Sequence, residues 1–373
     1  MNLLKYIILS FTLLLTPSVA QDNPELDGEM ARALIKVTDN IVPGISVAIA
    51  NSDGVVWSGT SGYSNIEEQN SVSQSHLFGI GDLSNYYLAA VLFQMAEEKM
   101  LDLNATPQSI LGEKVSHIEN ADSATLYQLL NHTSGIYSWA EDKSWRRRGR
   151  GVQMNPRYRW EKDEVLKYIS KDRHPANNKP GEAYAYSKSN YTLLGLIIEQ
   201  VSGGVIEDQV RNRILDPLGL SDTYYHTYEV VPYGQLIGSY HLATSQFISE
   251  VGINSKFEFG QDDLINTSNA SLSAEGIGGG IVTTPRDLVL FASALRNGKI
   301  LNEQSMKLFN VGNNHSQSDI LGFTADMHWL ENKLTIVSFI NLGTVNSGDS
   351  ETSTLLNSYM DKILLPIARK YAK

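Results

Sequence analysis

The hydrophobic pattern of the chain is strand-like near its two ends and helix-like in the middle. Two short apolar runs, 45–50 and 55–59, flank the turn-forming residues 51–54, which predicts a β-hairpin. A third β-like run covers 334–340. This order predicts an α+β fold, in which one antiparallel β-sheet takes strands from both ends of the chain and a mostly helical region of about 83–260 is inserted between them. Apolar residues at helical spacing predict helices over 26–41, 82–100, 126–130, 191–201, 287–295 and 357–371.

The first 20 residues differ from the rest of the chain. Lys5 is their only charge, residues 6–15 are almost all apolar, and residues 17–20 offer small side chains for cleavage. This pattern predicts a signal peptide over 1–20 and a single mature domain over 21–373. An uncleaved membrane anchor is the alternative, although the apolar run is short for a bilayer span. We therefore expect a periplasmic or secreted protein with no stable membrane span after cleavage.

Composition narrows the possible chemistry. The 373 residues are 42% hydrophobic and 19% charged, which is ordinary for a globular domain. A net charge of −11 argues against nucleic acid as a partner, because binding phosphates needs clustered Lys and Arg. The chain has no cysteine, which excludes disulfides, thiolate metal sites and a cysteine nucleophile. No two histidines stand at metal-ligand spacing along the sequence, so neither a metal nor a cofactor is expected.

Five segments in order resemble the serine β-lactamase and penicillin-binding-protein-like family, in its branch of class C β-lactamases and DD-carboxypeptidases. The resemblance covers roughly residues 30–345 and implies an antiparallel sheet, flanking terminal helices and an inserted helical subdomain. The segments are Pro43–Ala48, His76–Gly81, Leu129–Gly135, Lys179–Gly195 and Gly278–Thr284.

The resemblance breaks at the motifs that carry the family's chemistry. Those motifs are Ser-x-x-Lys, Tyr-x-Asn and Lys/His-Thr/Ser-Gly, of which the first supplies the nucleophile and a lysine one turn later. None of the 17 lysines here has Ser or Thr three residues before it, so no shift of alignment restores the first motif. The matching positions hold Asp82 and Asn85 in the first motif, Tyr186 and Lys188 in the second, and His315 and Ser316 in the third.

The lysine and the asparagine of the first two motifs are exchanged here. If the fold is kept, Asp82 and Lys188 should approach within about 4 Å, with Tyr186 beside them. Asp82 has two interpretations. It is a stabilising helix N-cap, or it forms an acid–base or zwitterion-binding cluster with Lys188 and Tyr186. Lys188 likewise either neutralises Asp82 as a buried pair or takes part in that chemistry.

These motifs favour an exported pseudoenzyme, a binding or regulatory protein with a serine-hydrolase fold and no serine nucleophile. Its expected partner is a small peptide-like or cell-wall ligand, or another protein. The alternative is an enzyme with a rebuilt Asp/Lys/Tyr acid–base site that acts on a small peptide-like or cell-wall-derived substrate.

An arginine-rich segment with nearby tryptophans is a second candidate site. Trp145, Arg146, Arg147 and Arg148 could hold an anionic or sugar-like ligand. The other interpretation is a solvated loop whose charge is balanced by neighbouring Asp and Glu side chains.

Overall fold

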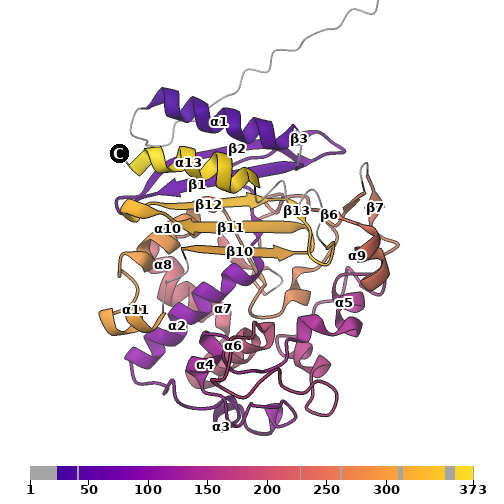
Figure 1. Cartoon of the computed structure of the whole chain (residues 1–373), viewed down its shortest axis with the longest axis vertical. Coiled ribbons are helices and arrows are strands. Elements are labelled where there is room, and N and C mark those ends of the chain that lie inside the picture. The colour runs from indigo at the N-terminus through magenta and orange to yellow at the C-terminus, as the bar shows by residue number, and fades with distance from the viewer. Residues whose placement is uncertain are drawn as a thin grey trace, which may run out of the picture.

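The computed structural model is built around one six-stranded antiparallel sheet with the strand order β10-β11-β12-β1-β2-β3 (Figure 1). The predicted signal peptide lies outside the described residues, and no described helix is long and apolar enough to cross a bilayer. The structure describes residues 23–39, 42–226, 228–260, 263–309, 314–348 and 358–372. The strands of the sheet are β1 (Gly44–Ala50), β2 (Val55–Asn65), β3 (Asn70–Ser71), β10 (His315–Ile320), β11 (Phe323–Trp329) and β12 (Thr335–Ile340).

The sheet joins the two ends of the chain, as the sequence predicted. β1 pairs with β2 in the hairpin and with β12 on its other side, so that Ile45 lies opposite Ile340. All seven residues of β1 are buried, because helices cover both faces of the sheet at this central strand. The second strand of the hairpin is longer than its apolar run and continues to Asn65.

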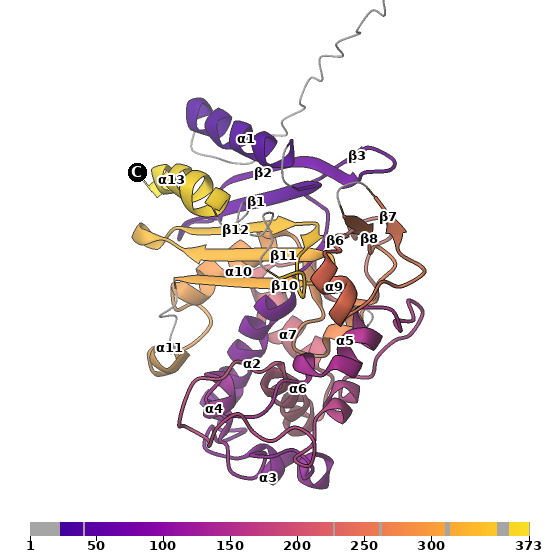
Figure 2. The same cartoon turned by 45° about the vertical axis from the view of Figure 1, so that its right-hand side comes forward.

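Helices from both termini cover one face of the sheet (Figures 1 and 2). Helix α1 (Pro24–Thr38) begins at Asn23, whose side chain accepts a hydrogen bond from the Leu26 backbone N–H at 3.2 Å. Its buried residues follow the three- and four-residue spacing of an amphipathic helix. They share a core with residues of β1 and of the C-terminal helical segment, which contains α13 (Leu365–Ala368). We call this side of the sheet the terminal-helix face.

The other face packs on α10 (Pro285–Arg296) and, beyond it, on a helical layer (Figure 2). Two helices of this layer, α2 (Asn85–Glu97) and α6 (Lys188–Ser202), are buried over most of their length. The remaining α-helices of the described residues are α3 (Pro107–Leu111), α4 (Leu126–Leu130), α5 (Lys143–Gly149), α7 (Ile206–Val210), α8 (Asp216–Leu218), α9 (Ser245–Glu250) and α11 (Glu303–Phe309).

The inserted region is less purely helical than expected. Strands β5, β6 and β7 lie within the predicted insertion of about 83–260, and β6 pairs in parallel with β13, which follows β12. The insertion is thereby tied back to the end of the main sheet. The short strands are β4 (Phe78–Gly79), β5 (Thr223–Tyr225), β6 (Tyr240–Leu242), β7 (Glu258–Phe259), β8 (Leu264–Asn266), β9 (Ile281–Thr283) and β13 (Leu342–Gly343).

The helix predicted over 82–100 begins with a separate 3₁₀ turn, η1 (Gly81–Ser84), and continues as α2. Gly81 has a φ of +46°, and a Cβ there would lie 2.3 Å from the Ser318 hydroxyl of β10. Only glycine allows this approach, which brings Asp82 directly against the edge of the sheet.

Candidate functional site

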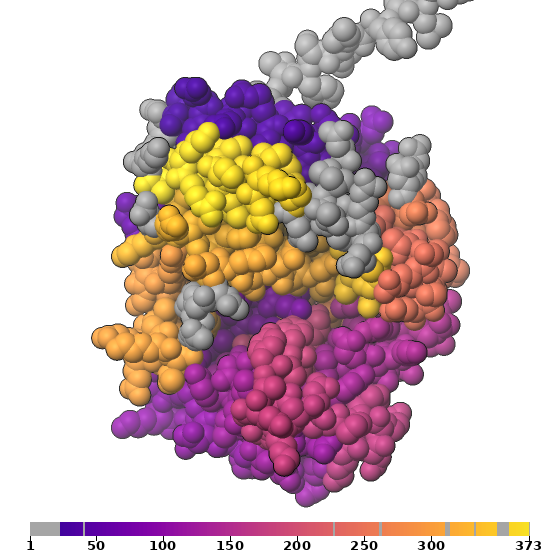
Figure 3. Space-filling model, viewed as in Figure 1, coloured from indigo at the N-terminus to yellow at the C-terminus, as the bar shows by residue number. Residues whose placement is uncertain are grey.

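The candidate site lies where η1, the start of α6 and strand β10 meet. Lys188 is the first residue of α6, and its Nζ lies 2.9 Å from Oδ1 of Asp82. This distance agrees with the predicted ion pair. On the molecular surface, a hollow separates the strand layer from the helical layer, and the segment coloured for α2 forms its floor (Figure 3).

Lys188 also contacts a second carboxylate, and the ion pair extends into a buried network. Its Nζ lies 2.8 Å from Glu275, which accepts two hydrogen bonds from Arg150 at 2.8 and 3.0 Å. The side chains of Glu275 and Arg150 are each only 3% exposed. Negative and positive groups alternate from Asp82 through Lys188 and Glu275 to Arg150, so the four formal charges cancel. Buried charges are tolerated when they are paired in this way.

The network fixes the protonation of its members. Burial alone would raise the pKa of Glu275, but the cations of Arg150 and Lys188 lower it to about 2. Burial would lower the pKa of Lys188, but the carboxylates of Asp82 and Glu275 raise it above its ordinary value. Glu275 is therefore a carboxylate and Lys188 an ammonium at neutral pH.

Tyr186 completes the group around Asp82, as predicted. Burial of its hydroxyl, the charge of Asp82 and a hydrogen bond to that carboxylate together hold the pKa of Tyr186 well above its usual value. Its ring lies 4.5 Å from that of His132, centroid to centroid. Burial lowers the pKa of His132 to about 4, although Asp82 opposes this shift, so the imidazole is neutral at pH 7.

The backbone N–H of Asp82 is engaged as well. It donates a hydrogen bond of 2.8 Å to the hydroxyl of Ser318 on β10. Asp82 is not the helix N-cap that one interpretation proposed, because η1 begins after Ile80, α2 begins after Ser84, and neither cap residue makes a side-chain capping bond. The carboxylate of Asp82 instead points to Lys188 and Tyr186.

The structure separates the two residues of the third motif. Side chains alternate between the faces of a strand, so Ser316 lies on the site's side of β10 and His315 on the terminal-helix face. Ser316 hydrogen-bonds to Tyr86 of α2, whereas His315 lies 3.1 Å from Asp326 of β11. The sequence grouped His315 with the site, and its position on the opposite face corrects that grouping.

Asn85, at the lysine position of the first motif, is buried at the start of α2. Within the described part of the chain its Oδ1 has no hydrogen-bond partner. The cation of the site is therefore supplied from α6 by Lys188 and not from α2.

Trp145, Arg146 and Arg148 of the arginine-rich segment are engaged within the protein rather than open to a ligand. Trp145 is fully buried and belongs to the main core, which corrects its assignment as a ligand-binding residue. Arg146 forms ion pairs with Glu141 and Glu250. Arg148 lies 3.5 Å from Glu164 and over the rings of Tyr158 and Trp160, and Arg147 is partly buried beside it.

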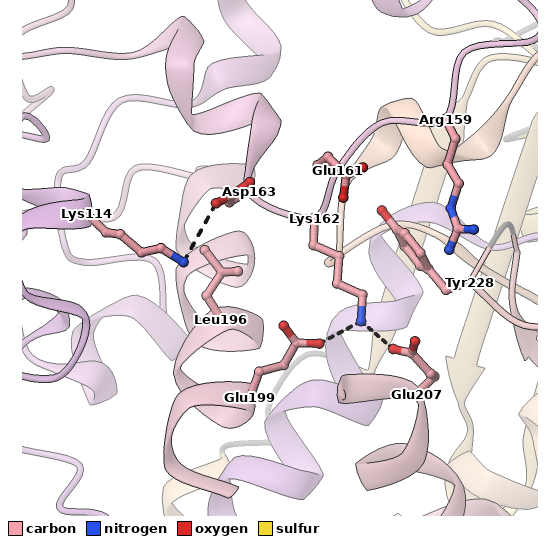
Figure 4. Close-up of a pocket in the computed structure, with 9 residues that line it drawn as sticks. All are labelled: Lys114, Arg159, Glu161, Lys162, Asp163, Leu196, Glu199, Glu207 and Tyr228. Carbon is pink, nitrogen blue, oxygen red and sulfur yellow. Dashed lines mark hydrogen bonds and ion pairs between the residues drawn. The ribbon is translucent and has the colours of Figure 1, made fainter. Parts of the chain in front are cut away.

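A separate pocket of about 330 Å³ lies in the helical layer (Figure 4). Lys162 points to two carboxylates there, at 2.6 Å from Glu199 and 2.5 Å from Glu207. The lining residues are Lys114, Arg159, Glu161, Lys162, Asp163, Leu196, Glu199, Glu207 and Tyr228.

Sequence reasoning gave neither Glu275 nor Arg150 a role at the site. Arg150 is 125 positions from Glu275, and no local pattern connects the two. The only available signal was the position of Glu275 directly before the glycine-rich stretch 276–280.

Comparisons with known proteins agree with this fold. The profile of the Beta-lactamase family matches residues 30–334. "Protein flp" of Staphylococcus aureus (strain COL) is 28% identical over 187 residues, or 49% of this chain, and the chain spans only 35% of that relative's length. D-amino acid amidase from Ochrobactrum anthropi SV3, solved with D-phenylalanine, superposes with a TM-score of 0.77 at 22% identity, covering 93% of this chain and 100% of the amidase.

An octameric penicillin-binding protein homologue from Pyrococcus abyssi has a TM-score of 0.67 at 19% identity, over 92% of this chain and 78% of that one. At these identities the two structures establish the fold, a β-lactamase-like serine hydrolase fold. The family profile covers most of the chain, and the protein therefore belongs to the Beta-lactamase family.

Proposed function

We propose that this protein is an exported, non-catalytic member of the family that binds a small peptide-like or cell-wall-derived ligand. The observation that carries the proposal is the state of Asp82. The sequence resemblance matches Asp82 to the family's nucleophile. Its carboxylate is held by Lys188 and Tyr186, and its backbone N–H is held by Ser318. An acyl-transfer site needs a hydroxyl or thiol nucleophile and free N–H donors for the developing oxyanion.

The loss of rate expected without a serine nucleophile supports this view. In a comparable serine hydrolase, removing the nucleophile lowers kcat by about 10⁶-fold. The rate that remains is only about 10³–10⁴ times that of the uncatalysed reaction in water. Attack by the Asp82 carboxylate on an amide would give an anhydride, which offers no efficient route to hydrolysis. Neither pathway supplies useful turnover of β-lactams or peptides.

The alternative, a rebuilt acid–base enzyme, requires a group that exchanges a proton near neutral pH. Lys188 and Tyr186 both have pKa values raised above their ordinary ranges, so neither accepts a proton from substrate at pH 7. Asp82 is paired with both. This arrangement favours a fixed polar surface over proton transfer.

The surface beside Asp82 suits a ligand with an aromatic or peptide face. Tyr186 is 40% exposed and Tyr184 is 69% exposed, and the neutral His132 ring lies beside both. Aromatic side chains with one open face bind flat groups by stacking. D-phenylalanine, the ligand of the amidase structure, is therefore a suitable first probe.

The test combines covalent labelling, turnover and binding. Wild-type protein is incubated with a fluorescent penicillin and with a fluorophosphonate, and its intact mass is measured. Hydrolysis of D-phenylalanine amide is followed by chromatography, and binding of D-phenylalanine and of cell-wall peptides by calorimetry. We expect no adduct, no turnover, and saturable binding that Tyr184→Ala weakens.

Other outcomes of these measurements contradict the proposal or support the alternative. A mass increase mapped to any serine refutes the non-catalytic assignment. Turnover that disappears in Asp82→Asn supports the rebuilt enzyme. Export is tested separately, by cell fractionation and by N-terminal sequencing of the mature protein, and a mature chain that retains residues 1–20 contradicts the predicted cleavage.

A further inference from the structure

Three possible metal ligands meet on the terminal-helix face of the sheet, on the opposite side from the candidate site. His315 of β10 lies directly opposite His328 of β11, and Asp326 lies two residues before His328 on the same face. The Nε2 atoms of His315 and His328 lie 3.1 and 2.7 Å from Oδ1 of Asp326. One potential ligand atom from each residue falls within 4.8 Å of the other two.

Two of these atoms, on His328 and Asp326, are buried and in close but poorly directed contact. The side chains of His328 and Asp326 are 9% and 6% exposed. Despite their separation of 2.7 Å, His328 Nε2 and Asp326 Oδ1 make no well-directed hydrogen bond within the described residues. A poorly directed contact leaves part of the bonding capacity of two buried polar atoms unused, which is unfavourable. A cation placed between the atoms would bind both at once.

We propose that His315, Asp326 and His328 bind one divalent transition-metal ion, with zinc as the best match. Imidazole nitrogen and carboxylate oxygen are typical zinc ligands, and three protein ligands leave a fourth position for water or another group. Side chains that lack sulfur and include two imidazoles favour zinc over calcium or magnesium, which prefer oxygen ligands.

The geometry needs only a local adjustment. Ligand atoms about 2.1 Å from a tetrahedral zinc ion lie roughly 3.4 Å apart. The observed separations of 2.7 and 3.1 Å must therefore open by less than about 1 Å. His315 is half exposed, so its ring has room to turn and gives the ion a path from solvent. Its ring is stacked on that of His328 with centroids 4.1 Å apart, which keeps both imidazoles on the same side.

The sequence could not predict this site, because its ligands are adjacent only through the β10–β11 register. His315 and His328 are 13 positions apart, and no short spacing motif connects them. The site is independent of the proposed ligand binding, because the sheet separates the two.

Untagged full-length protein, stripped with a chelator and dialysed, provides the test. Zinc binding is measured by calorimetry and by the metal content after a second dialysis, and cobalt is used as a spectroscopic substitute. We expect one zinc per chain and a visible cobalt spectrum typical of tetrahedral coordination. His315→Ala should weaken zinc binding by more than about 100-fold, since even loss of an outer-shell partner costs 10–100-fold.

Asp326→Asn gives a second variant of similar volume, with the same expected loss. The matched control is His174→Ala. His174 also lies 3.3 Å from an aspartate, Asp142, but no second histidine of the described residues joins that pair in a metal-ligand cluster. Its removal should leave the stoichiometry and affinity unchanged. The proposal is overturned if stripped wild-type protein takes up no zinc, or if His315→Ala binds zinc as wild type does.

Discussion

Lys188 should contribute more to stability than any surface lysine, because it joins two buried or partly buried carboxylates. We consider Lys188→Met, which removes the ammonium but keeps an apolar chain of similar length beside Trp139. Removing one member of a buried ion pair costs about 3–5 kcal/mol. Glu275 keeps both of its hydrogen bonds from Arg150, and the side chain of Asp82 is 23% exposed to water. The expected loss of stability is therefore at the lower end of that range, about 3 kcal/mol.

A double-mutant cycle separates the cost of an unpaired charge from that of lost packing. Asp82→Asn combined with Lys188→Met removes one charge of each sign and leaves the Arg150–Glu275 pair intact. The double variant should therefore be more stable than Lys188→Met alone, by about 1 kcal/mol or more. Glu275→Gln should cost more than Lys188→Met, about 4–5 kcal/mol, because it leaves the buried Arg150 without a carboxylate.

Urea unfolding at pH 7, followed by tryptophan fluorescence, measures these free energies. The control is Lys307→Met on α11, which breaks a 2.6 Å pair with Glu303 whose two side chains are largely exposed. Such surface pairs are worth less than about 1 kcal/mol. The reasoning fails if Lys188→Met unfolds within about 0.5 kcal/mol of wild type, or if the double variant is less stable than both single variants.

Three further predictions follow from the same contacts. The stabilising effect of Glu275, whose pKa is lowered from 4.5 to about 2, is fully present above pH 4.5 and is lost as the pH falls toward 2. Wild type should therefore lose stability in urea unfolding across that window, and Glu275→Gln should lose less. Asp319 behaves in the opposite sense, because burial raises its pKa from 3.8 to about 6 despite hydrogen bonds from Thr344. Its effect on stability is most favourable below pH 3.8 and is lost as the pH rises through 6. Asp319→Asn should therefore flatten the dependence of unfolding free energy on pH between these values, and an unchanged dependence contradicts this. Finally, the triple change Asp82→Ser, Asn85→Lys and Lys188→Asn restores the residues of the family's first two motifs, and adding Ser318→Ala frees the N–H of residue 82. Labelling by a fluorescent penicillin should be absent in wild type and strongest in the quadruple variant, and equal labelling of the triple and quadruple variants would show that Ser318 does not block that N–H.

The sequence predicted the parts of the fold that have a regular pattern. The hairpin of β1 and β2 and its pairing with β12 were recoverable because these strands carry apolar runs bounded by turn residues. Strand β11 was not predicted, although its sequence alternates apolar and polar residues along Phe323–Trp329 as a strand does. All seven of its residues are buried, and the burial of Asp326 and His328 on the polar face does not follow from that alternation. Its polar residues are explained only by the cross-strand neighbours that the fold supplies.

The candidate site was predictable to the extent that it rests on short motifs. Asp82, Tyr186 and Lys188 were found because the neighbouring segments resemble the family, and the ion pair followed from opposite charges at facing positions. The second half of the network could not be found in this way. No sequence pattern connects Arg150, Glu275 and Lys188, and only the fold brings Glu275, at the end of η6 (Leu272–Glu275), into contact with both cations.

The position of the cation gives the strongest argument about how this site is maintained. In the family's motifs the lysine lies on the helix that carries the nucleophile, whereas here the ammonium comes from α6 and the helix position holds Asn85. Because Glu275 and Arg150 already form a neutral buried pair, adding Lys188 alone would bury a net positive charge, and adding Asp82 alone would leave a carboxylate beside Tyr186 without a cation. The two replacements are favourable only together, since each supplies the countercharge of the other. This mutual dependence is a property of packing and charge and requires no catalysis. A site kept only for such pairing should tolerate exchange of the whole Asp82–Lys188 pair for a neutral pair, with ligand binding retained, whereas a working acid–base site should not.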